Sequence, residues 1–324
     1  MNCLAVWYEH KPSRAREKLD IELHLNLWKL NKKNGEKESP FKNFLDIGIK
    51  ILEPSNVANI CIFTPFKVSK KEIEDLGHYF EDDNRLVAAI FNEEFNSTAS
   101  TQSKTLQIKD AEDNIQFYVY MVDIKNDVVR PPKNYGGTVI RIKVRSHAGI
   151  KPLYYRIRIN SDKLEELYTQ YKPESTWLES HSTNTELIDF RVNEKRNLDK
   201  SLLEEMHDSG VVNFKRVDYF VMREFKYDYV SSQTEMVRSR RLEEDLWDSY
   251  VGDDCECGKI IAYHWKWPVP PEVAVRGFNA FVKYRFLTSD RKTRRRFFLF
   301  LLFVGFLGGG LGTLLMKLIE IWWK

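Results

Sequence analysis

Five basic side chains on two neighbouring predicted strands are the strongest candidates for ligand binding in this sequence. Residues 139–145 and 153–159 alternate apolar and basic residues on either side of a turn that contains Gly and Pro, which predicts a β-hairpin. One face of this hairpin is apolar and would pack on a core. The opposite face would carry the cations Arg141, Lys143, Arg145, Arg156 and Arg158.

This basic face predicts contact with an anion. Like charges on facing strands cost stability, by about 1 kcal/mol or less per pair, unless an anionic group neutralises them. Candidates for that group are a phosphate-bearing ligand, nucleic acid, anionic lipid and an acidic neighbouring strand. The alternative interpretation is a solvated outer face whose cations pair with carboxylates of the same chain and keep an exposed edge soluble.

A second candidate is a metal site at Cys255, Cys257 and the downstream His264. Two thiols one residue apart, with carboxylates beside them, are suitable ligands for a soft cation. Structural zinc needs four ligands, usually supplied by CxxC pairs, and one CxC is present here. The favoured interpretation is therefore an acidic turn bounded by Gly252 and Gly258, with no metal and no cofactor.

Motifs of common enzyme classes are absent from the sequence. It contains no Gly-rich phosphate loop, no GxGxxG, no HExxH and no GxSxG, and its seven histidines lack metal-ligand spacing. The run of residues 186–196 is rich in ionisable groups but lacks the carboxylate–x–Lys ending that a nuclease site would need. These observations favour a non-enzymatic protein, with a membrane-tethered nuclease or hydrolase as the alternative.

The elements that would position these groups are mainly strands. Residues 21–27 and 45–51 alternate apolar with polar residues, and residues 60–63, 86–91, 115–122 and 214–229 are further predicted strands. Helices are predicted near residues 69–80, 162–172, 201–207 and 240–250, two of them from capping boxes. We therefore expect an α+β body, mainly antiparallel β with a few helices.

Residues 126–137 are the best internal boundary because they combine a Pro pair with a Gly pair and show no periodicity. They predict a linker or a long connection between a β-rich subdomain at 1–125 and an α+β subdomain at 138–282. The chain has four cysteines without the spacing of a disulfide framework, which indicates a reducing compartment.

A transmembrane helix is predicted at residues 297–316, which are apolar and carry no charge. Twenty helical residues span about 30 Å, the thickness of the hydrocarbon core. A basic juxtamembrane segment, 283–296, precedes this span, and a short tail, 317–324, follows it. Since cations beside a span remain in the cytoplasm, residues 1–290 are predicted to be cytosolic and the tail extracytosolic. The cations that set this topology and attract anionic lipid are Arg291, Lys292, Arg294, Arg295 and Arg296.

The net positive charge of the chain comes from the residues next to the predicted span. The chain carries +3 overall, residues 283–296 carry +6 and residues 297–324 carry +1, which leaves the first 282 residues at −4. Overall charge therefore gives no support for nucleic-acid binding by the body, although it does not exclude nucleic acid as a partner.

Two interleaved GxxxG pairs lie within the predicted span. They are formed by Gly305 and Gly309 and by Gly308 and Gly312, and such pairs let two helix backbones approach closely. A homo-oligomer is therefore expected. One alternative is a glycine-rich helix without a partner, tolerated because the lipid environment enforces backbone hydrogen bonds. Another is a hinge at residues 308–310, with residues 311–324 lying as an amphipathic helix at the membrane interface.

Together these patterns predict a tail-anchored membrane protein whose cytosolic body binds a ligand or protein partner and whose transmembrane helix self-associates. Such a protein would act as a sensor, an adaptor or an effector that perturbs the membrane, a layout also used in bacterial defence. The alternatives are a membrane-tethered enzyme and a passive scaffold for a larger complex.

Overall fold

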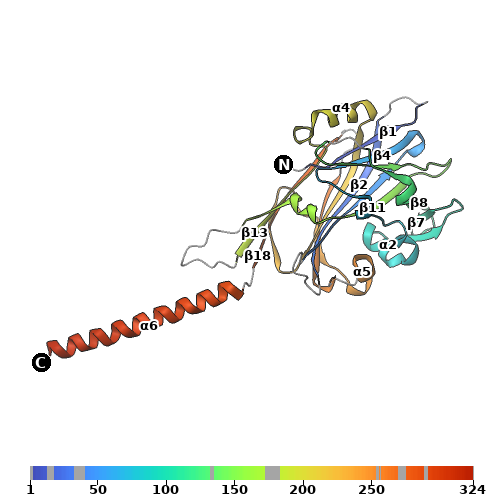
Figure 1. Ribbon diagram of the computed structural model, residues 1–324. Coiled ribbons are helices and arrows are strands. Elements are labelled where there is room, and N and C mark those ends of the chain that lie inside the picture. Colours follow the sequence, from blue (N-terminus) through green and yellow to red (C-terminus); the bar gives the residue numbers. More distant parts are fainter. Residues whose placement is uncertain are drawn as a thin grey trace.

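The computed structural model describes residues 3–12, 18–32, 41–131, 135–171, 183–252, 255, 257–268, 275–287 and 291–323. These residues form three β-sheets with helices on their outer faces, followed by one long C-terminal helix (Figure 1). The predicted α+β body, mainly antiparallel β with a few helices, is confirmed.

The largest sheet forms one layer of the body. Its order is β16 (Arg238–Arg241), β17 (Ile260–Pro268), β14 (Val212–Glu224), β2 (Leu19–Asn31), β3 (Phe41–Ile51), β11 (Leu153–Asn160), β8 (Ile115–Tyr120), β7 (Thr105–Lys109) and β6 (Asn96–Ala99), with β5 (Ile73–Asp75) paired to β11. Neighbouring strands run antiparallel except for β14 with β2 and β11 with β8. This sheet joins strands from both predicted subdomains, so residues 126–137 do not coincide with a break between sheets.

Two four-stranded antiparallel sheets form the second layer. One has the order β1 (Ala5–His10), β4 (Val57–Thr64), β10 (Thr138–Lys143) and β9 (Val128–Val129). The other has the order β12 (Tyr168–Tyr171), β13 (Thr183–Val192), β18 (Phe278–Leu287) and β15 (Tyr227–Ser232). A bridge between Leu4 and Val192 brings the two sheets side by side.

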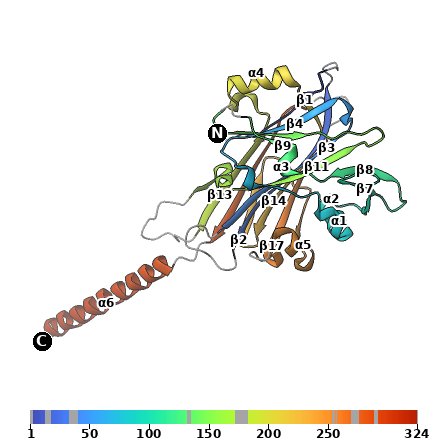
Figure 2. The same cartoon turned by 45° about the vertical axis from the view of Figure 1, so that its right-hand side comes forward.

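The main core lies between these two layers. Side chains of a strand alternate between its two faces, and Leu23, Leu25 and Leu27 of β2 enter this core with Ile62 of β4 and Ile188 of β13. On the outer side of the first small sheet, α4 (Lys200–Ser209) packs over Trp7. On the outer face of the large sheet lie α1 (Tyr79–Asp82), α2 (Asn84–Phe91) and α5 (Glu244–Val251). Figure 2 shows α4 and α5 on opposite sides of the body.

Short elements complete the body. They are α3 (Ile124–Asp127) and the 3-10 turns η1 (Pro54–Asn56), η2 (Lys70–Glu72), η3 (Asp162–Leu167), η4 (Lys195–Asn197) and η5 (Cys257–Lys259).

Several elements predicted from the sequence differ from those of the structure. The predicted strand at residues 86–91 is part of α2, because a short apolar run fits either structure. The predicted helix at 69–80 is η2, β5 and α1 in succession, and the one beginning near residue 162 is η3 and β12.

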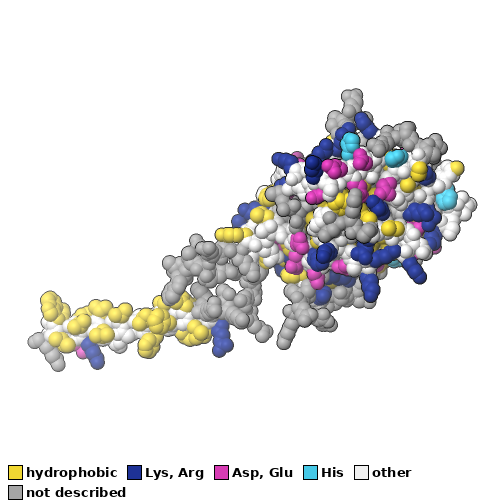
Figure 3. Space-filling view, turned by 45° about the horizontal axis from the view of Figure 1, so that its top comes forward, with side chains coloured by type: hydrophobic (Ala, Val, Ile, Leu, Met, Phe, Trp, Pro, Cys, Tyr) yellow, Lys and Arg dark blue, Asp and Glu magenta, His cyan; other side chains and the backbone are white. Residues whose placement is uncertain are grey.

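The last helix, α6 (Arg291–Trp322), projects away from the sheets (Figures 1 and 2). Its stretch Phe298–Trp322 is long and apolar enough to cross a membrane, and none of that stretch is buried against the body. In Figure 3 hydrophobic side chains cover much of this helix. The predicted span lies inside this longer helix. The predicted basic segment is not a separate element, since it comprises the end of β18, residues 288–290 and the first turns of α6.

Candidate functional site

A layer of buried polar side chains runs across the large sheet on the face that α2 and α5 cover. Polar residues alternate with core residues along β2, β3, β11, β14 and β17, so that they all emerge on this face. Each of them is at most 7% exposed: His24, Asn26, Asp46, Arg156, Arg158, Asp218 and His264. Burying so many polar groups is costly unless they bond to one another.

Asp46 is the centre of one half of this layer. Its carboxylate accepts hydrogen bonds from Arg158 Nε at 2.7 Å, the Tyr250 hydroxyl at 2.8 Å and Trp28 Nε1 at 3.0 Å. Arg156 donates to the same Tyr250 hydroxyl at 2.9 Å, and its Nη2 lies 3.8 Å from Asp46. One carboxylate thus serves two buried guanidinium groups.

Burial and charge act in opposite directions on these groups. Burial lowers the pKa of Arg158, but the adjacent Asp46 carboxylate and Tyr250 raise it above its ordinary value overall. Burial is also the main reason why the pKa of Tyr250 is raised. Arg158 therefore remains charged and Tyr250 remains a neutral donor, which suits the hydrogen bonds that they form.

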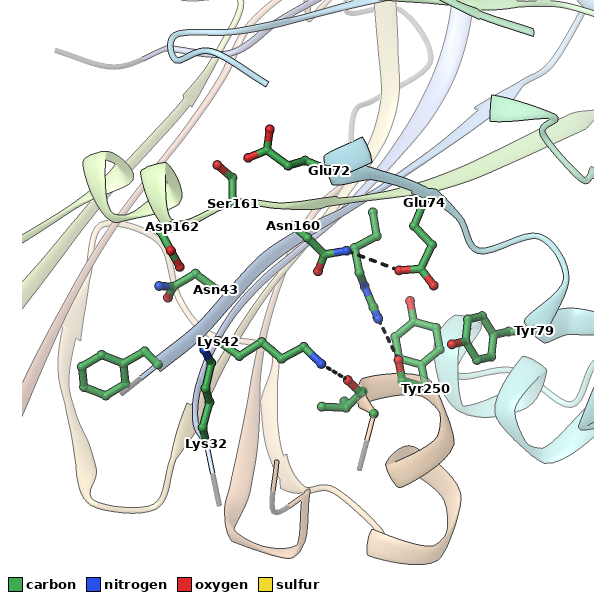
Figure 4. A pocket seen from close by; sticks show the side chains of 14 residues that line it. Lys32, Lys42, Asn43, Glu72, Glu74, Tyr79, Asn160, Ser161, Asp162 and Tyr250 are labelled. Carbon is green, nitrogen blue, oxygen red and sulfur yellow. Dashed lines mark hydrogen bonds between the residues drawn. The ribbon is translucent and has the colours of Figure 1, made fainter. Parts of the chain in front are cut away.

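A cavity of about 520 Å³ opens beside Arg158 and Tyr250 (Figure 4). Lys42 Nζ donates to the Val251 carbonyl across it at 2.8 Å, and Asn160 donates to Glu74 at 3.3 Å. Among the described residues its charged lining is balanced, with three cations and three carboxylates: Lys32, Lys42, Arg158, Glu72, Glu74 and Asp162. Such a lining favours a polar ligand of no particular net charge.

A smaller cavity, of about 190 Å³, lies over the other half of the polar layer, between the end of α2 and strands β14, β16 and β17. Asp218 accepts a hydrogen bond from His264 Nε2 at 2.9 Å and another from Arg216 Nε. His24 Nε2 lies 3.6 Å from the same carboxylate. Two imidazoles and a guanidinium therefore surround Asp218.

These contacts decide which groups are charged. Burial lowers the pKa of His24 to about 3, although Asp218 acts in the opposite direction, so His24 is neutral at physiological pH. Burial raises the pKa of Asp218, but the hydrogen bond from His264 and the nearby His24 and Arg216 lower it well below its ordinary value overall. Asp218 is therefore ionised.

One chain of contacts joins the two cavities. His24 Nδ1 lies 3.3 Å from the Tyr154 hydroxyl, which accepts a hydrogen bond from Arg156 Nη1 at 3.0 Å. Arg156 in turn contacts Tyr250 and Asp46. Polar groups are thus in contact from Asp218 in the smaller cavity to Arg158 in the larger one.

A further buried ion cluster lies in the main core. Glu186 of β13 accepts from Lys29 Nζ at 2.5 Å and from Arg223 Nε at 2.7 Å, and all three are at most 1% exposed. The Lys29 ammonium also lies 4.3 Å from the centre of the Tyr168 ring. The partners of Glu186 are therefore side chains of the fold itself. In the same ionisable run, Asp189 pairs with Arg191 and Glu194 pairs with Arg196.

The predicted basic hairpin is wrong, because its two strands belong to different layers. β10 pairs with β4 and β9, whereas β11 pairs with β3, β5 and β8. An alternating pattern identifies a strand but not its partner, and here the partners are remote in sequence. The five cations Arg141, Lys143, Arg145, Arg156 and Arg158 consequently do not form one face.

Most of these cations pair with carboxylates of the same chain. Arg141 lies 2.8 Å from Glu9 and 3.0 Å from Glu205. Arg145 lies 2.7 Å from Asp127. Arg156 and Arg158 belong to the buried layer described above, while Lys143 is exposed and forms no ion pair with a described residue.

Cys255 and Cys257 are buried in the core beneath α5, and neither is in a disulfide. Burial is the main reason why the pKa of Cys257 is raised far above its ordinary value, so it is a thiol and not a thiolate. His264 is bonded to Asp218 instead. Within the described residues no group of three His, Cys, Asp or Glu side chains is arranged to hold a metal.

The sequence contains a signal for the smaller cavity that a search for core residues misses. Arg216 and Asp218 alternate with Val217 and Tyr219 along β14, which places two charges on the face opposite the core. What the sequence does not indicate is that α2 covers this face.

In α6 the glycines lie on an exposed helix. A Cβ added at Gly305, Gly308, Gly309 or Gly312 would meet no neighbouring atom within 4 Å. The helix runs through these positions without a break, and the Thr313 hydroxyl donates to the Gly309 carbonyl at 3.0 Å. Among the basic flanking residues Arg291, Lys292, Arg294, Arg295 and Arg296, the structure describes one side chain, that of Arg295, which is exposed.

No protein-family model and no curated protein matches the chain. Among solved structures, the Mu homology domain of Danio rerio Fcho1 with a bound Eps15 peptide shares 7% identity with it, with a TM-score of 0.17, over 85% of this chain and 82% of that one. The yeast delta-COP-I mu-homology domain complexed with a Dsl1 WxWxV peptide also shares 7% identity, with a TM-score of 0.19, over 86% and 79%. At such scores the likeness has no bearing on function.

Proposed function

We propose that this protein is a single-pass membrane protein whose β-sheet body is a binding module held at the membrane surface. The exposure of α6 carries this proposal. None of the described side chains of Phe298–Trp322 is buried, and a helix that is apolar all round is not stable in water. At 1.5 Å per residue these 25 residues extend about 37 Å, which is enough to cross the hydrocarbon core.

The basic residues before the span support an orientation with the body in the cytoplasm. Arg285 is exposed near the end of β18, and the predicted topology-setting cations Arg291, Lys292, Arg294, Arg295 and Arg296 follow within a few residues. Cations next to a span are retained on the cytoplasmic side and attract anionic lipid.

Binding is favoured over catalysis by the state of the charged groups. Most buried charged side chains of the body are paired with one another in ion pairs. Their role is therefore to stabilise the fold. The Asp218–His264 pair is the observation that favours an enzyme, since a carboxylate can orient an imidazole as a general base. The described lining of that cavity, however, contains no Ser, Thr or Cys that could serve as a nucleophile.

Self-association of α6 is the remaining part of the proposal. The four glycines Gly305, Gly308, Gly309 and Gly312 provide a surface on which a second α6 can pack closely, and the body leaves this surface free. A ligand bound by the body would then influence how the helices associate, as in a sensor, adaptor or effector. In a passive scaffold, assembly would not depend on a ligand.

Deletion of residues 297–324 tests the anchor. We expect the shortened chain in the soluble fraction after cell lysis and the full chain in the membrane fraction, resistant to a high-salt wash. A chain lacking only residues 317–324 serves as the control and should stay in the membrane. If the chain without 297–324 still sediments with membranes after the wash, α6 is not what holds the protein there.

A further inference from the structure

We infer that the smaller cavity, over Asp218 and His264, binds the phosphate group of a small soluble molecule. This inference rests on the proposed role of the body as a binding module and names its ligand class. The argument begins with three basic side chains from three adjacent strands, Arg238 of β16, Lys266 of β17 and Arg216 of β14.

The register of the strands brings these side chains to one place. Arg238 lies opposite His264 on the neighbouring strand, and Lys266 lies opposite Asp218. Residues opposite one another in a sheet share a face, and so do residues two apart in a strand. All of these groups therefore surround the same cavity.

Two of the three cations form no ion pair within the described part of the chain. Asp218 and Glu93, the carboxylates that line the cavity, both contact Arg216, and Glu93 does so at 3.8 Å. Arg238 and Lys266 form no ion pair with any residue that the structure describes. Burial and the nearby Arg240 lower the pKa of Arg238, and the charge of Asp218 offsets this only in part. A further anion at the cavity would therefore stabilise the Arg238 guanidinium.

A buried polar atom beside these cations is also unsatisfied. His264 is 7% exposed, and its Nε2 is engaged by Asp218, but its Nδ1 has no hydrogen-bond partner in the described part of the chain. Its ring stacks on Phe220, with centroids 4.1 Å apart and an angle of 4° between the planes, so its orientation is fixed. Buried polar atoms are rarely left without a partner. Because Nε2 carries the proton that Asp218 accepts, Nδ1 of the neutral ring is an acceptor, and the hydroxyl of a monoprotonated phosphate would supply the missing donor.

The size of the cavity limits the ligand. A volume of 190 Å³ equals that of about six water molecules, which suits a phosphate and a few attached atoms but not a drug-sized molecule. An arginine guanidinium matches the oxygens of a phosphate in a bidentate manner, and Arg238 is available for this.

The position of the cavity favours a soluble molecule over a lipid headgroup. β14 ends at Glu224, and Tyr227, three residues later, pairs with Phe286 near the end of β18 that leads to α6. Asp218 lies six residues back along β14, or about 20 Å from that end at 3.3 Å per residue. A headgroup in the bilayer would have to reach across this distance.

Binding of inorganic phosphate to the full chain in detergent micelles, measured by isothermal titration calorimetry, tests the inference. We expect saturable binding that Arg238→Ala weakens about tenfold, the loss of one charge-assisted contact. Lys266→Ala should also weaken phosphate binding. Because the Lys266 side chain is exposed, this variant should still fold. Arg196→Ala is the matched control: it removes an exposed arginine of the η4 turn and should leave phosphate affinity unchanged.

Three results would overturn the inference. One is the absence of phosphate binding by the parent protein at tens of millimolar. Another is equal affinity in the parent, Arg238→Ala and Lys266→Ala proteins. The third is binding of a phosphoinositide in mixed micelles without any binding of inorganic phosphate, which would assign the cavity to lipid. None of these results concerns anchorage, which the deletion of residues 297–324 tests separately.

Discussion

The Tyr154 hydroxyl occupies the space that a side chain at Gly48 would fill. A Cβ built at Gly48 would lie 2.0 Å from this oxygen, far inside contact distance. Gly48 of β3 lies between His24 of β2 and Arg156 of β11, both of which contact Tyr154. The absence of one methyl group therefore lets the chain of polar contacts pass over the middle of the sheet.

Replacing this glycine should destabilise the body. We expect Gly48→Ala to lower the free energy of unfolding by about 1–3 kcal/mol, the usual cost of overpacking, because Tyr154 is fully buried and must shift. Thermal unfolding followed by tryptophan fluorescence measures the change. Gly310→Ala, which lies outside the two GxxxG pairs and whose new methyl group meets no atom within 4 Å, is the control and should melt like the parent. An unchanged melting temperature for Gly48→Ala would contradict the packing described here.

Asp46→Asn should be more damaging. It leaves the Arg156 and Arg158 guanidinium groups buried without a counter-charge, which typically costs about 3–5 kcal/mol. Urea unfolding of the full chain in micelles would report the loss. Asp189→Asn breaks the more exposed pair with Arg191 and should cost no more than about 1 kcal/mol. Equal effects of the two changes would mean that Asp46 does not support the buried pair.

His24 should make the protein less stable in mild acid. Its pKa is lowered from 6.5 to about 3 in the folded protein, mainly by burial, so the unfolded chain binds the proton more readily. This contribution to stability is present above pH 6.5 and is lost as the pH falls toward 3. The loss amounts to about 2 kcal/mol between pH 7.5 and pH 5.

Unfolding free energies at pH 7.5 and pH 5 check this dependence. His24→Gln should reduce the difference between the two values, whereas His207→Gln, which alters an exposed histidine, should not. A pH dependence that is the same in the parent and His24→Gln proteins would assign the acid sensitivity to other groups.

The glycine surface of α6 can be tested in membranes. Gly309→Leu combined with Gly312→Leu adds bulk where one chain leaves open space, so insertion should survive while close packing of two helices should not. Crosslinked oligomers should diminish at least several-fold. The volume-conserving pair Leu301→Ile and Leu302→Ile should crosslink like the parent. Undiminished crosslinking of the glycine variant would place self-association in the body.

Asn96 provides a reporter of orientation. It begins the sequon Asn96–Ser97–Thr98 and is exposed on β6. In a translation system with microsomes, a cytosolic body should leave Asn96 unmodified, while a sequon on an extension after residue 324 should be glycosylated. A gel shift that Asn96→Gln abolishes would show that the body is lumenal and that the predicted topology is inverted.

Local patterns predicted the elements better than their partners. Alternation at Leu23, Leu25 and Leu27 correctly predicted a strand, and the apolar residues of that strand do enter the main core. The apolar helix at the C-terminus was also predictable, because length and composition alone decide whether a helix is suited to a bilayer.

The polar layer could not be predicted from such patterns. The alternation around Leu25 predicts that His24 and Asn26 face water, whereas α2 and α5 cover that face and bury both. Pairing of Arg158 with Asp46 depends on contact between β11 and β3, which lie more than 100 residues apart. Which strand pairs with which depends on the whole fold, and a short window of sequence does not indicate it.

The parallel pairing of β2 with β14 bears on the order in which the body can form. It joins Leu19 to Val212 at the centre of the large sheet, so β2 has no partner on that side until 193 further residues have been made. At the rate of protein synthesis this delay is about 10–40 s. During this time the unpaired N–H and C=O groups along this edge of β2 can pair with a wrong strand, and chaperones would have to cover them.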